Sequence, residues 1–303
     1  MWLCEKHRFD TVSGLRYTHS MVSKQDYLAA LLRAYWFAPP VALWRAVELR
    51  TAAAEQYHRP LLDFGCGDGL IGGALFGVAD SQPPVDAGFD PWEEQLRRAA
   101  RTGVYRHLAL ADGHRLPYRD GAFATVFSNS VLEHIPDPVP IVGEVGRVLQ
   151  AGGRFIFTVP SDGFRTLLDG YVRRAEAGDL PGAEAYAAGV DRWLEHHHYH
   201  TPEEWADLLA GAGMELVKAR YYIPEPVERL WDRMNDRFGL RRRSVWRVLA
   251  SPRLRGLGYQ PLLRRLVVRV LSRRWRSFYE AEVPPGEKGG GLLIVAQRGG
   301  GDG

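Results

Sequence analysis

The segment with the clearest chemical potential is a glycine-rich turn, Asp-Phe-Gly-Cys-Gly-Asp-Gly, at residues 63–69. It follows an apolar run over 61–64 that is typical of a buried strand, and it precedes an apolar stretch that favours a helix. Glycine permits positive φ angles and lets a ligand approach the backbone, while amides at a helix start can bind a carboxylate. The turn is therefore a candidate ligand site, although a tight turn without a ligand would have the same sequence.

Two carboxylates at the ends of the next two predicted strands strengthen this interpretation. Asp90 ends the strand predicted over 85–89, and Asp112, followed by Gly113, ends the strand predicted over 107–111. From these positions the first carboxylate can accept both ribose hydroxyls, and the second can accept from an adenine amino group. A glycine turn with carboxylates at two consecutive strand ends predicts a nucleoside site.

Alternating strands and helices from residue 60 onward would position these residues. Helices are predicted to begin at Leu70, Pro91 and Pro138, and a capping box at 201–204 begins another. The predicted strands are 61–64, 85–89, 107–111, 123–128, 154–159, 214–223 and 292–297. This pattern predicts an α/β fold, a Rossmann-like sheet of seven mostly parallel strands with helices on both faces.

The pattern also divides the chain into parts. Helices predicted over 25–37 and 41–54 are separated by Pro39-Pro40, because proline cannot continue the first helix. The segment before the last strand is too long for a hairpin loop and requires helices of its own. We therefore expect a helical N-terminal cover (1–58), a sheet domain (59–223 with 291–298), a basic helical insertion (224–290) and a flexible tail (299–303).

Composition limits the class of protein. The 303 residues contain two cysteines, Cys4 and Cys66, without metal-ligand spacing, which argues against a disulfide framework or a structural zinc site. No run of about 18 apolar residues exists, and residues 1–10 are charged where a signal peptide needs an apolar core. We expect a cytoplasmic protein.

The net charge of +3 hides a strongly basic segment. Residues 239–276 contain twelve arginines and no lysine or acid, which leaves 27 basic against 36 acidic residues elsewhere, a net charge of −9. Residues 261–276 predict an amphipathic helix, with one apolar stripe (Leu262, Leu263, Leu266, Val267, Val270 and Leu271) opposite Arg264, Arg265, Arg269 and Arg273.

This helix has three interpretations. We favour a helix packed on its own domain with a solvated arginine face, since the stripe is no longer than ordinary helices need. The alternative is peripheral contact through 239–276 with an anionic membrane, which would place the protein at the inner membrane face. Nucleic acid is disfavoured as a partner because the acidic remainder of the chain would repel it.

Several runs of sequence closely resemble class I S-adenosylmethionine (SAM)-dependent methyltransferases, particularly the small-molecule subgroup of the ubiquinone and menaquinone enzymes. The matching runs are Leu-Asp-Phe-Gly-Cys-Gly-Asp-Gly (62–69), Gly-Phe-Asp (88–90), Ala-Asp-Gly-His-Arg-Leu-Pro-Tyr (111–118), Val-Leu-Glu-His-Ile-Pro-Asp (131–137) and Arg-Val-Leu-Gln-Ala-Gly-Gly-Arg-Phe (147–155). The resemblance covers about half of the chain. It is specific for the cofactor and says little about the acceptor.

By this resemblance SAM is the cofactor. Its methionine part would lie on the glycine turn and near Asn129, its ribose on Asp90, and its adenine between Pro91 or Trp92 and the Asp112–Gly113 pair. The cofactor-binding residues implied are Asp63, Gly65, Cys66, Gly67, Gly69, Asp90, Pro91, Trp92, Asp112, Gly113 and Asn129.

A nicotinamide dehydrogenase is the alternative within the same architecture. It requires G-x-G-x-x-G, whereas this chain has G-x-G-x-G with Leu70 at the last dehydrogenase position. The acid two residues before Gly65, the Asp112–Gly113 pair and the late strand over 292–297 all favour the methyltransferase.

Methyl transfer from a sulfonium requires alignment of the acceptor and, for a hydroxyl, removal of its proton. His134, after the fourth strand, is the candidate catalytic base, since histidine titrates near neutrality. It would otherwise order the loop or the cofactor without moving a proton. In the ubiquinone subgroup an acid four residues before the histidine joins Glu-His in binding metal, but Ser130 stands there, and we predict no metal.

A histidine run at 196–200 precedes the capping box. Neighbours on an extended segment point in different directions and no acid partners them at a recognisable spacing, so a metal site is disfavoured. We expect this loop to border the acceptor pocket, with His198, Tyr199 and His200 as substrate-binding residues.

The sequence therefore predicts a methyltransferase that acts on a small-molecule or lipid-linked acceptor, by O-methylation of a sugar, glycolipid or quinone-like hydroxyl. The alternative is a non-catalytic protein that keeps the SAM-binding fold for binding or scaffolding at a membrane surface. Formation of S-adenosylhomocysteine with an acceptor would separate the two.

Overall fold

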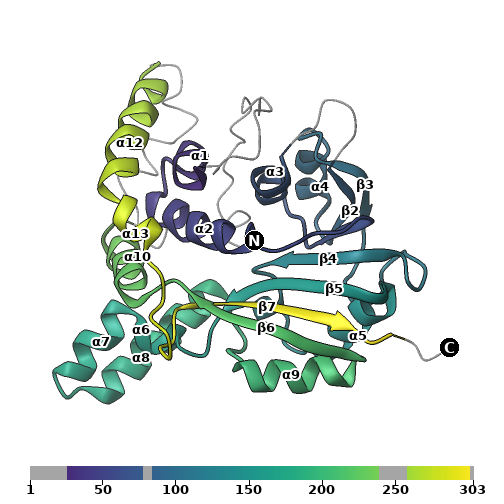
Figure 1. Cartoon of the computed structure of the whole chain (residues 1–303). Helices are drawn as coiled ribbons and strands as arrows, with labels where there is room; N and C mark the ends of the chain where they lie inside the picture. Colours follow the sequence, from purple (N-terminus) through teal and green to yellow (C-terminus); the bar gives the residue numbers. More distant parts are fainter. Residues whose placement is uncertain (1–25, 78–83, 239–257, 301–303) are drawn as a thin grey trace.

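A seven-stranded sheet forms the centre of the computed structural model, which describes residues 26–77, 84–238 and 258–300 (Figure 1). The strand order is β3-β2-β1-β4-β5-β7-β6. The strands are β1 (Leu61–Phe64), β2 (Val85–Asp90), β3 (Tyr105–Leu110), β4 (Phe123–Asn129), β5 (Leu149–Pro160), β6 (Met214–Tyr222) and β7 (Gly291–Arg298). Strands β1 to β5 pair in parallel, and β7 runs antiparallel between β5 and β6. The predicted fold class is confirmed.

Helices cover the sheet because its central strands are apolar on both faces, as parallel strands usually are. One buried cluster includes Phe127, Ile156 and Val295, and the other includes Phe64, Phe155 and Ile294. The helices of the sheet domain are α3 (Leu70–Phe76), α4 (Glu93–Ala99), α5 (Val139–Val148) and α9 (Pro202–Gly211). The capping box at Thr201 and Glu204 is present as predicted.

Two details of the prediction were wrong. The two N-terminal helices are separate as predicted, but the second, predicted from residue 41, is α2 (Pro39–Ala52) and begins at the prolines, which occupy its first turn, where a missing N–H costs nothing. The strand predicted from Arg154 begins at Leu149, and Gly152 lies inside β5 with a φ of 73°. The register of β5 against β4 shifts at this point, so the glycine serves a bulge.

Three helices between β5 and α9 were missed by the sequence analysis. They are α6 (Phe164–Leu167), α7 (Asp169–Glu176) and α8 (Leu180–Leu194). They share a third buried cluster with Trp231 and, at its border, Trp44. Figure 1 shows these helices at the side of the sheet where α10 also lies, beyond the carboxyl ends of the parallel strands.

The remaining helices pack together in space although they lie at opposite ends of the chain. Helix α1 (Tyr27–Ala34) contacts α12 (Gln260–Arg274), and α2 contacts α10 (Glu225–Phe238) and α13 (Arg276–Glu280) (Figure 1). The prediction that six apolar residues of α12 form a single stripe opposite its arginines was wrong in part. Val267 is buried and Leu263 and Leu271 pack beside it, whereas Leu262, Leu266 and Val270 are exposed.

Parts of the predicted organisation lie outside the described residues. These are residues 1–25 of the N-terminal cover, 239–257 of the basic insertion and 301–303 of the tail. Among the described residues, no helix combines the length and apolar character that crossing a bilayer requires.

Candidate active site

The glycine turn connects β1 to α3 and has the backbone that its sequence predicts. Gly65, Gly67 and Gly69 have φ angles of 71°, 54° and 77°, in the left-handed region that favours glycine. A Cβ at Gly65 would lie 2.7 Å from Val131 Cγ2, so a larger residue is also excluded by space. The N–H of Cys66 donates to Phe89 O at 2.9 Å, which ties the turn to β2.

The acids of the first two strands are buried beneath the turn. Asp90 Oδ2 accepts from the N–H of Gly67 at 2.9 Å, and its Oδ1 accepts from the N–H of Trp92 at 3.0 Å. Asp63 Oδ2 accepts from the Tyr105 hydroxyl at 2.6 Å. Burial raises the pKa of Asp63 to about 7, against the bond from Tyr105, and the charge of Asp90 raises it further. Asp90 thus holds the turn through Gly67, while Asp63 beneath it is charged only above a pH of about 7.

The residues predicted to meet adenine lie at the same edge of the sheet. Trp92 is exposed, as is Asp112, whose carboxylate accepts from the N–H of His114 at 3.0 Å and lies 2.6 Å from its Nδ1. A Cβ at Gly113 would lie 2.8 Å from the ring of Phe64, so glycine lets this loop close against β1. Pro91 and Trp92 follow Asp90 directly, before α4.

A buried polar network joins the end of β4 to helix α2. Glu48, fully buried, accepts from the Asn129 side chain at 3.2 Å, the Ser130 hydroxyl at 2.9 Å and the Tyr222 hydroxyl at 2.8 Å. Arg45 donates to Glu48 and to Ser130, each at 2.6 Å. Asn129 Oδ1 is buried without a hydrogen-bond partner among the described residues, so this oxygen is suited to a donor such as the ammonium group of SAM.

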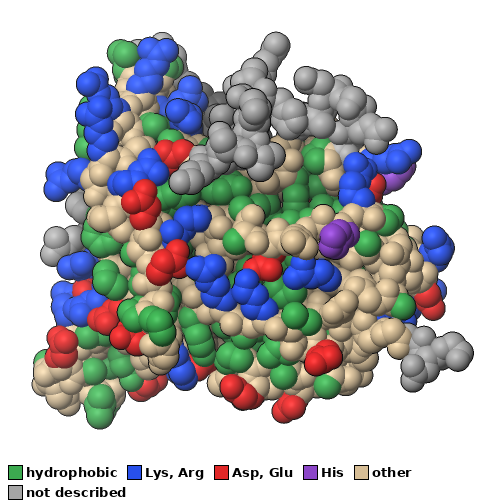
Figure 2. Space-filling view, viewed as in Figure 1, with side chains coloured by type: hydrophobic (Ala, Val, Ile, Leu, Met, Phe, Trp, Pro, Cys, Tyr) green, Lys and Arg blue, Asp and Glu red, His purple; other side chains and the backbone are tan. Residues whose placement is uncertain are grey.

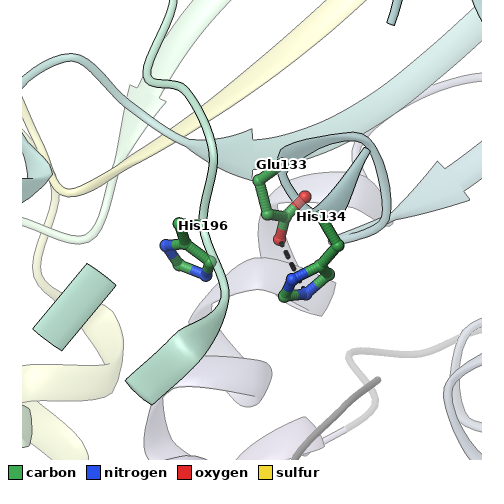
Figure 3. Close-up of side chains that lie close together, drawn as sticks. All are labelled: Glu133, His134 and His196. Carbon is green, nitrogen blue, oxygen red and sulfur yellow. Dashed lines mark ion pairs between the residues drawn. The ribbon is translucent and has the colours of Figure 1, made fainter. Parts of the chain in front are cut away.

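The loop after β4 carries Glu133 and His134 in a 3-10 turn, η2 (Leu132–His134). His134 Nδ1 donates to Glu195 O at 3.1 Å, and its Nε2 lies 3.9 Å from Glu133 Oε1. Figure 3 shows that His196, from the segment after α8, faces both side chains. The ring centroids of His134 and His196 are 5.3 Å apart.

The loops that carry these residues are held to each other by backbone bonds. The N–H of His197 donates to Glu133 O at 2.9 Å, and Glu195 takes a left-handed φ of 60° beside it. Ser130 also takes a left-handed φ, of 50°. Such angles are uncommon for non-glycine residues and persist where surrounding contacts fix them, so both loops are firmly placed.

Burial sets the protonation of the cluster formed by Glu133, His134 and His196. It lowers the pKa of His134 to about 3 and lowers that of His196, so both rings are neutral near pH 7. Burial raises the pKa of Glu133 to about 7, although the charge of Arg45 opposes the shift. Glu133 Oε2 is buried and has no hydrogen-bond partner among the described residues.

The histidine run contributes His196 to this cluster, a residue that the sequence analysis did not select. The three predicted substrate-binding residues of the run make other contacts. His198 Nε2 contacts Ile135 O at 3.1 Å, and His198 stacks on His200, with both rings against Trp205. Tyr199 donates to Asp191 at 2.6 Å. His196 was missed because nothing in its spacing pairs it with Glu133, 63 residues earlier.

The same cluster could hold a metal ion. Glu133, His134 and His196 each offer one ligand atom, and these three atoms lie within 4.8 Å of one another. Ser130, four residues before His134, is committed to Glu48 and Arg45, and its hydroxyl is not a free fourth ligand. The sequence-based expectation of no metal stays a prediction.

Comparisons with known proteins agree with this site. Residues 62–157 match the family described as a methyltransferase domain. A ubiquinone biosynthesis O-methyltransferase from Xanthomonas euvesicatoria is 26% identical over 67% of this chain and 85% of its own. An uncharacterized methyltransferase from Mycobacterium sp. (strain KMS) is 32% identical over 45% of this chain and 53% of its own.

The fold has a similar solved structure, a SAM-dependent methyltransferase from Thermotoga maritima. The two share 14% identity with a TM-score of 0.54, over 89% of this chain and 99% of that one. Together with the glycine turn and the strand-end acids, the matches in sequence show that the chain carries a class I SAM-dependent methyltransferase domain, and the solved structure shows the same fold. It is an enzyme, and its cofactor is SAM.

Proposed function

We propose that this methyltransferase methylates a hydroxyl group of a small or lipid-linked acceptor, such as a sugar, a glycolipid or a quinone-like molecule, with His134 as the base. The observation that carries the proposal is the orientation of one ring. Since His134 Nδ1 donates to Glu195 O, its Nε2 keeps a lone pair, and this nitrogen lies beside the buried Glu133 carboxyl group.

This orientation supports proton removal by His134. The low pKa keeps the ring neutral at physiological pH, so Nε2 is free to accept a proton but holds it weakly. A buried imidazolium is costly without a counter-charge, and ionised Glu133, 3.9 Å from Nε2, supplies it. The acceptor hydroxyl would therefore lose its proton to Nε2 as its oxygen takes the methyl group, and the electron pair of the broken carbon–sulfur bond would leave on sulfur as S-adenosylhomocysteine.

The other residues would align the reactants. When bound, SAM supplies a methyl group activated on sulfonium. The turn at 63–69 would hold the methionine part, Asn129 Oδ1 would accept from its amino group, and Asp90 would accept from ribose. Pro91 or Trp92 with Asp112 and Gly113 would enclose adenine. His198, Tyr199 and His200 would border the acceptor through the loop that also carries His196.

The choice of acceptor draws support from two features. The Xanthomonas relative is named for O-methylation in ubiquinone biosynthesis, which favours a quinone-like hydroxyl. A lipid-linked acceptor would bring the enzyme to a membrane, and the arginine-rich segment 239–276, whose alternative interpretation is membrane contact, would then meet it.

The test is product formation. Purified enzyme with SAM and a panel of phenols, quinols and glycolipids should release S-adenosylhomocysteine and a methyl ether, both measured by mass spectrometry. A search for ligands that co-purify with the enzyme would narrow the panel. Transfer to amines or carbon acids alone would reject the hydroxyl acceptor.

A further inference from the structure

Helix α12 has a second apolar stripe that faces solvent. Leu262, Leu266 and Val270 follow one another at four-residue spacing and are 68%, 57% and 41% exposed. They are three of the eight large hydrophobic residues that are exposed within the described part of the chain. The opposite side of the helix already packs through Val267 on the core that it shares with α1. The outer stripe is therefore not part of the hydrophobic core that anchors α12.

Arginines flank this stripe on the same side. Arg265, Arg269 and Arg273 are exposed and lie on the face that carries Leu262 and Leu266, since residues three and four apart are neighbours on a helix. Helix α12 contains no acid, and among the described residues no carboxylate pairs with these three arginines. Figure 2 shows basic side chains gathered over α12 at the upper left.

Arg276, just beyond the end of α12, differs from these three arginines because it has a carboxylate partner. Arg276 pairs with Asp26 of the segment before α1, which fixes the end of α12 to the body. The positive charge of the outer face is therefore available to a partner, while the helix itself is anchored at its inner side and at its end.

We propose that this outer face of α12, made of Leu262, Leu266, Val270, Arg265, Arg269 and Arg273, docks on an anionic lipid bilayer. Exposed leucines that share a face with arginines suit an interface where acyl chains take up apolar side chains and phosphates pair with guanidinium groups. Nucleic acid would use the charges and leave the leucines in water. The proposal does not depend on which acceptor the enzyme methylates.

The experiment is flotation of the full chain with vesicles, read by the protein fraction that rises with lipid. Phosphatidylcholine vesicles with phosphatidylglycerol are compared with phosphatidylcholine alone, at low salt and at about 0.5 M salt. Wild type should float with the anionic vesicles, several-fold less at high salt, and stay behind with the neutral ones.

Two variants separate the contributions of charge and apolar contact. Arg265→Gln/Arg269→Gln/Arg273→Gln should weaken anionic binding about a hundredfold, because three charges near the surface are lost. Leu262→Asn/Leu266→Asn/Val270→Asn should weaken it about tenfold or more, since insertion is lost while charge is kept. The matched control, Arg101→Gln/Arg106→Gln/Arg119→Gln, removes three exposed arginines elsewhere and should bind as wild type.

Three results would overturn the proposal. These are no binding of wild type to anionic vesicles at low salt, equal loss in the control, or full binding by the leucine variant. Light scattering of the same proteins tests whether a second copy of the chain occupies this face instead. A wild-type dimer that the leucine substitutions dissociate would assign the face to a second copy of the chain. Since SAM affinity is measured separately, failure here leaves the methyl-transfer proposal untouched.

Discussion

The two halves of the proposed active site are built in different ways. The cofactor half, from Asp63 to Asn129, is made by consecutive strand ends, and its turn is tied to Asp90 only 23 residues from Gly67. The acceptor half joins distant segments: His134 is held by Glu195, 61 residues away, and Ser130 by Arg45, 85 residues away.

This contrast shows why SAM binding is evident from the motifs while the acceptor is not. A cofactor site made of backbone angles and strand-end acids has a local signature. An acceptor site made of contacts between η2, α2 and the loop after α8 has none. Substitutions in the first half should change SAM affinity, those in the second should change turnover, and the network at Glu48 should change both.

The largest effect is expected where the halves meet, at Glu48. Glu48→Ala leaves Arg45, whose side chain is 17% exposed, without its carboxylate, and loss of one partner of a buried ion pair costs up to about 3–5 kcal/mol of folding stability. Urea denaturation measures this cost. The double variant Arg45→Met/Glu48→Leu, which removes both charges, should recover a large part of it; an equal loss in the double variant would contradict the assigned cause.

Gly65→Ala tests the cofactor half. A left-handed φ and a Cβ 2.7 Å from Val131 should displace the turn, with a penalty of about 3 kcal/mol, or roughly 100-fold in SAM affinity. Calorimetry gives the affinity. Gly143→Ala, at a position in α5 with open space around it, is the control and should bind SAM normally.

His134→Asn tests the acceptor half. Turnover should fall by about 10² or more while SAM affinity stays near normal, because the base is lost and the cofactor contacts remain. His107→Asn, an exposed position on β3, serves as the matched control. If the variant retains turnover within a few-fold, His134 orders the loop and alignment alone carries the reaction.

Asp90→Ala should cost about 1–3 kcal/mol of SAM binding, since the ribose loses a charged acceptor and the turn loses its bond from Gly67. Unchanged affinity in a folded variant would reject the role of this carboxylate. Asp207→Ala, an exposed acid on α9, controls for the loss of one negative charge.

The smallest expected effect is a pH dependence of SAM binding. Asp63, with its pKa raised to about 7, is neutral below that pH and ionised above it. Its negative charge attracts the cationic cofactor, so affinity should rise several-fold as pH increases through about 7. Asp63→Asn should remove this rise in calorimetric titrations across the range, and a persistent rise would point to another group.

Much of the fold could be predicted because its signals are local. The runs at 61–64 and 123–128 are apolar on both faces, as strands covered by helices must be, and Thr201 with Glu204 marks a helix start. The extension of β5 to Leu149 was missed because Gly152-Gly153 has the composition of a helix stop, and pairing with β4 overrides that local preference.

The sequence by itself determined the sheet, the glycine turn and the order of strand-end acids, since each depends on backbone preferences within a few residues. Only the tertiary structure decided that His196 meets Glu133 and His134, and that Glu48 is buried among Arg45, Asn129, Ser130 and Tyr222. It also decided which leucines of α12 face solvent, because periodicity places residues on a helix but packing chooses the side that is covered.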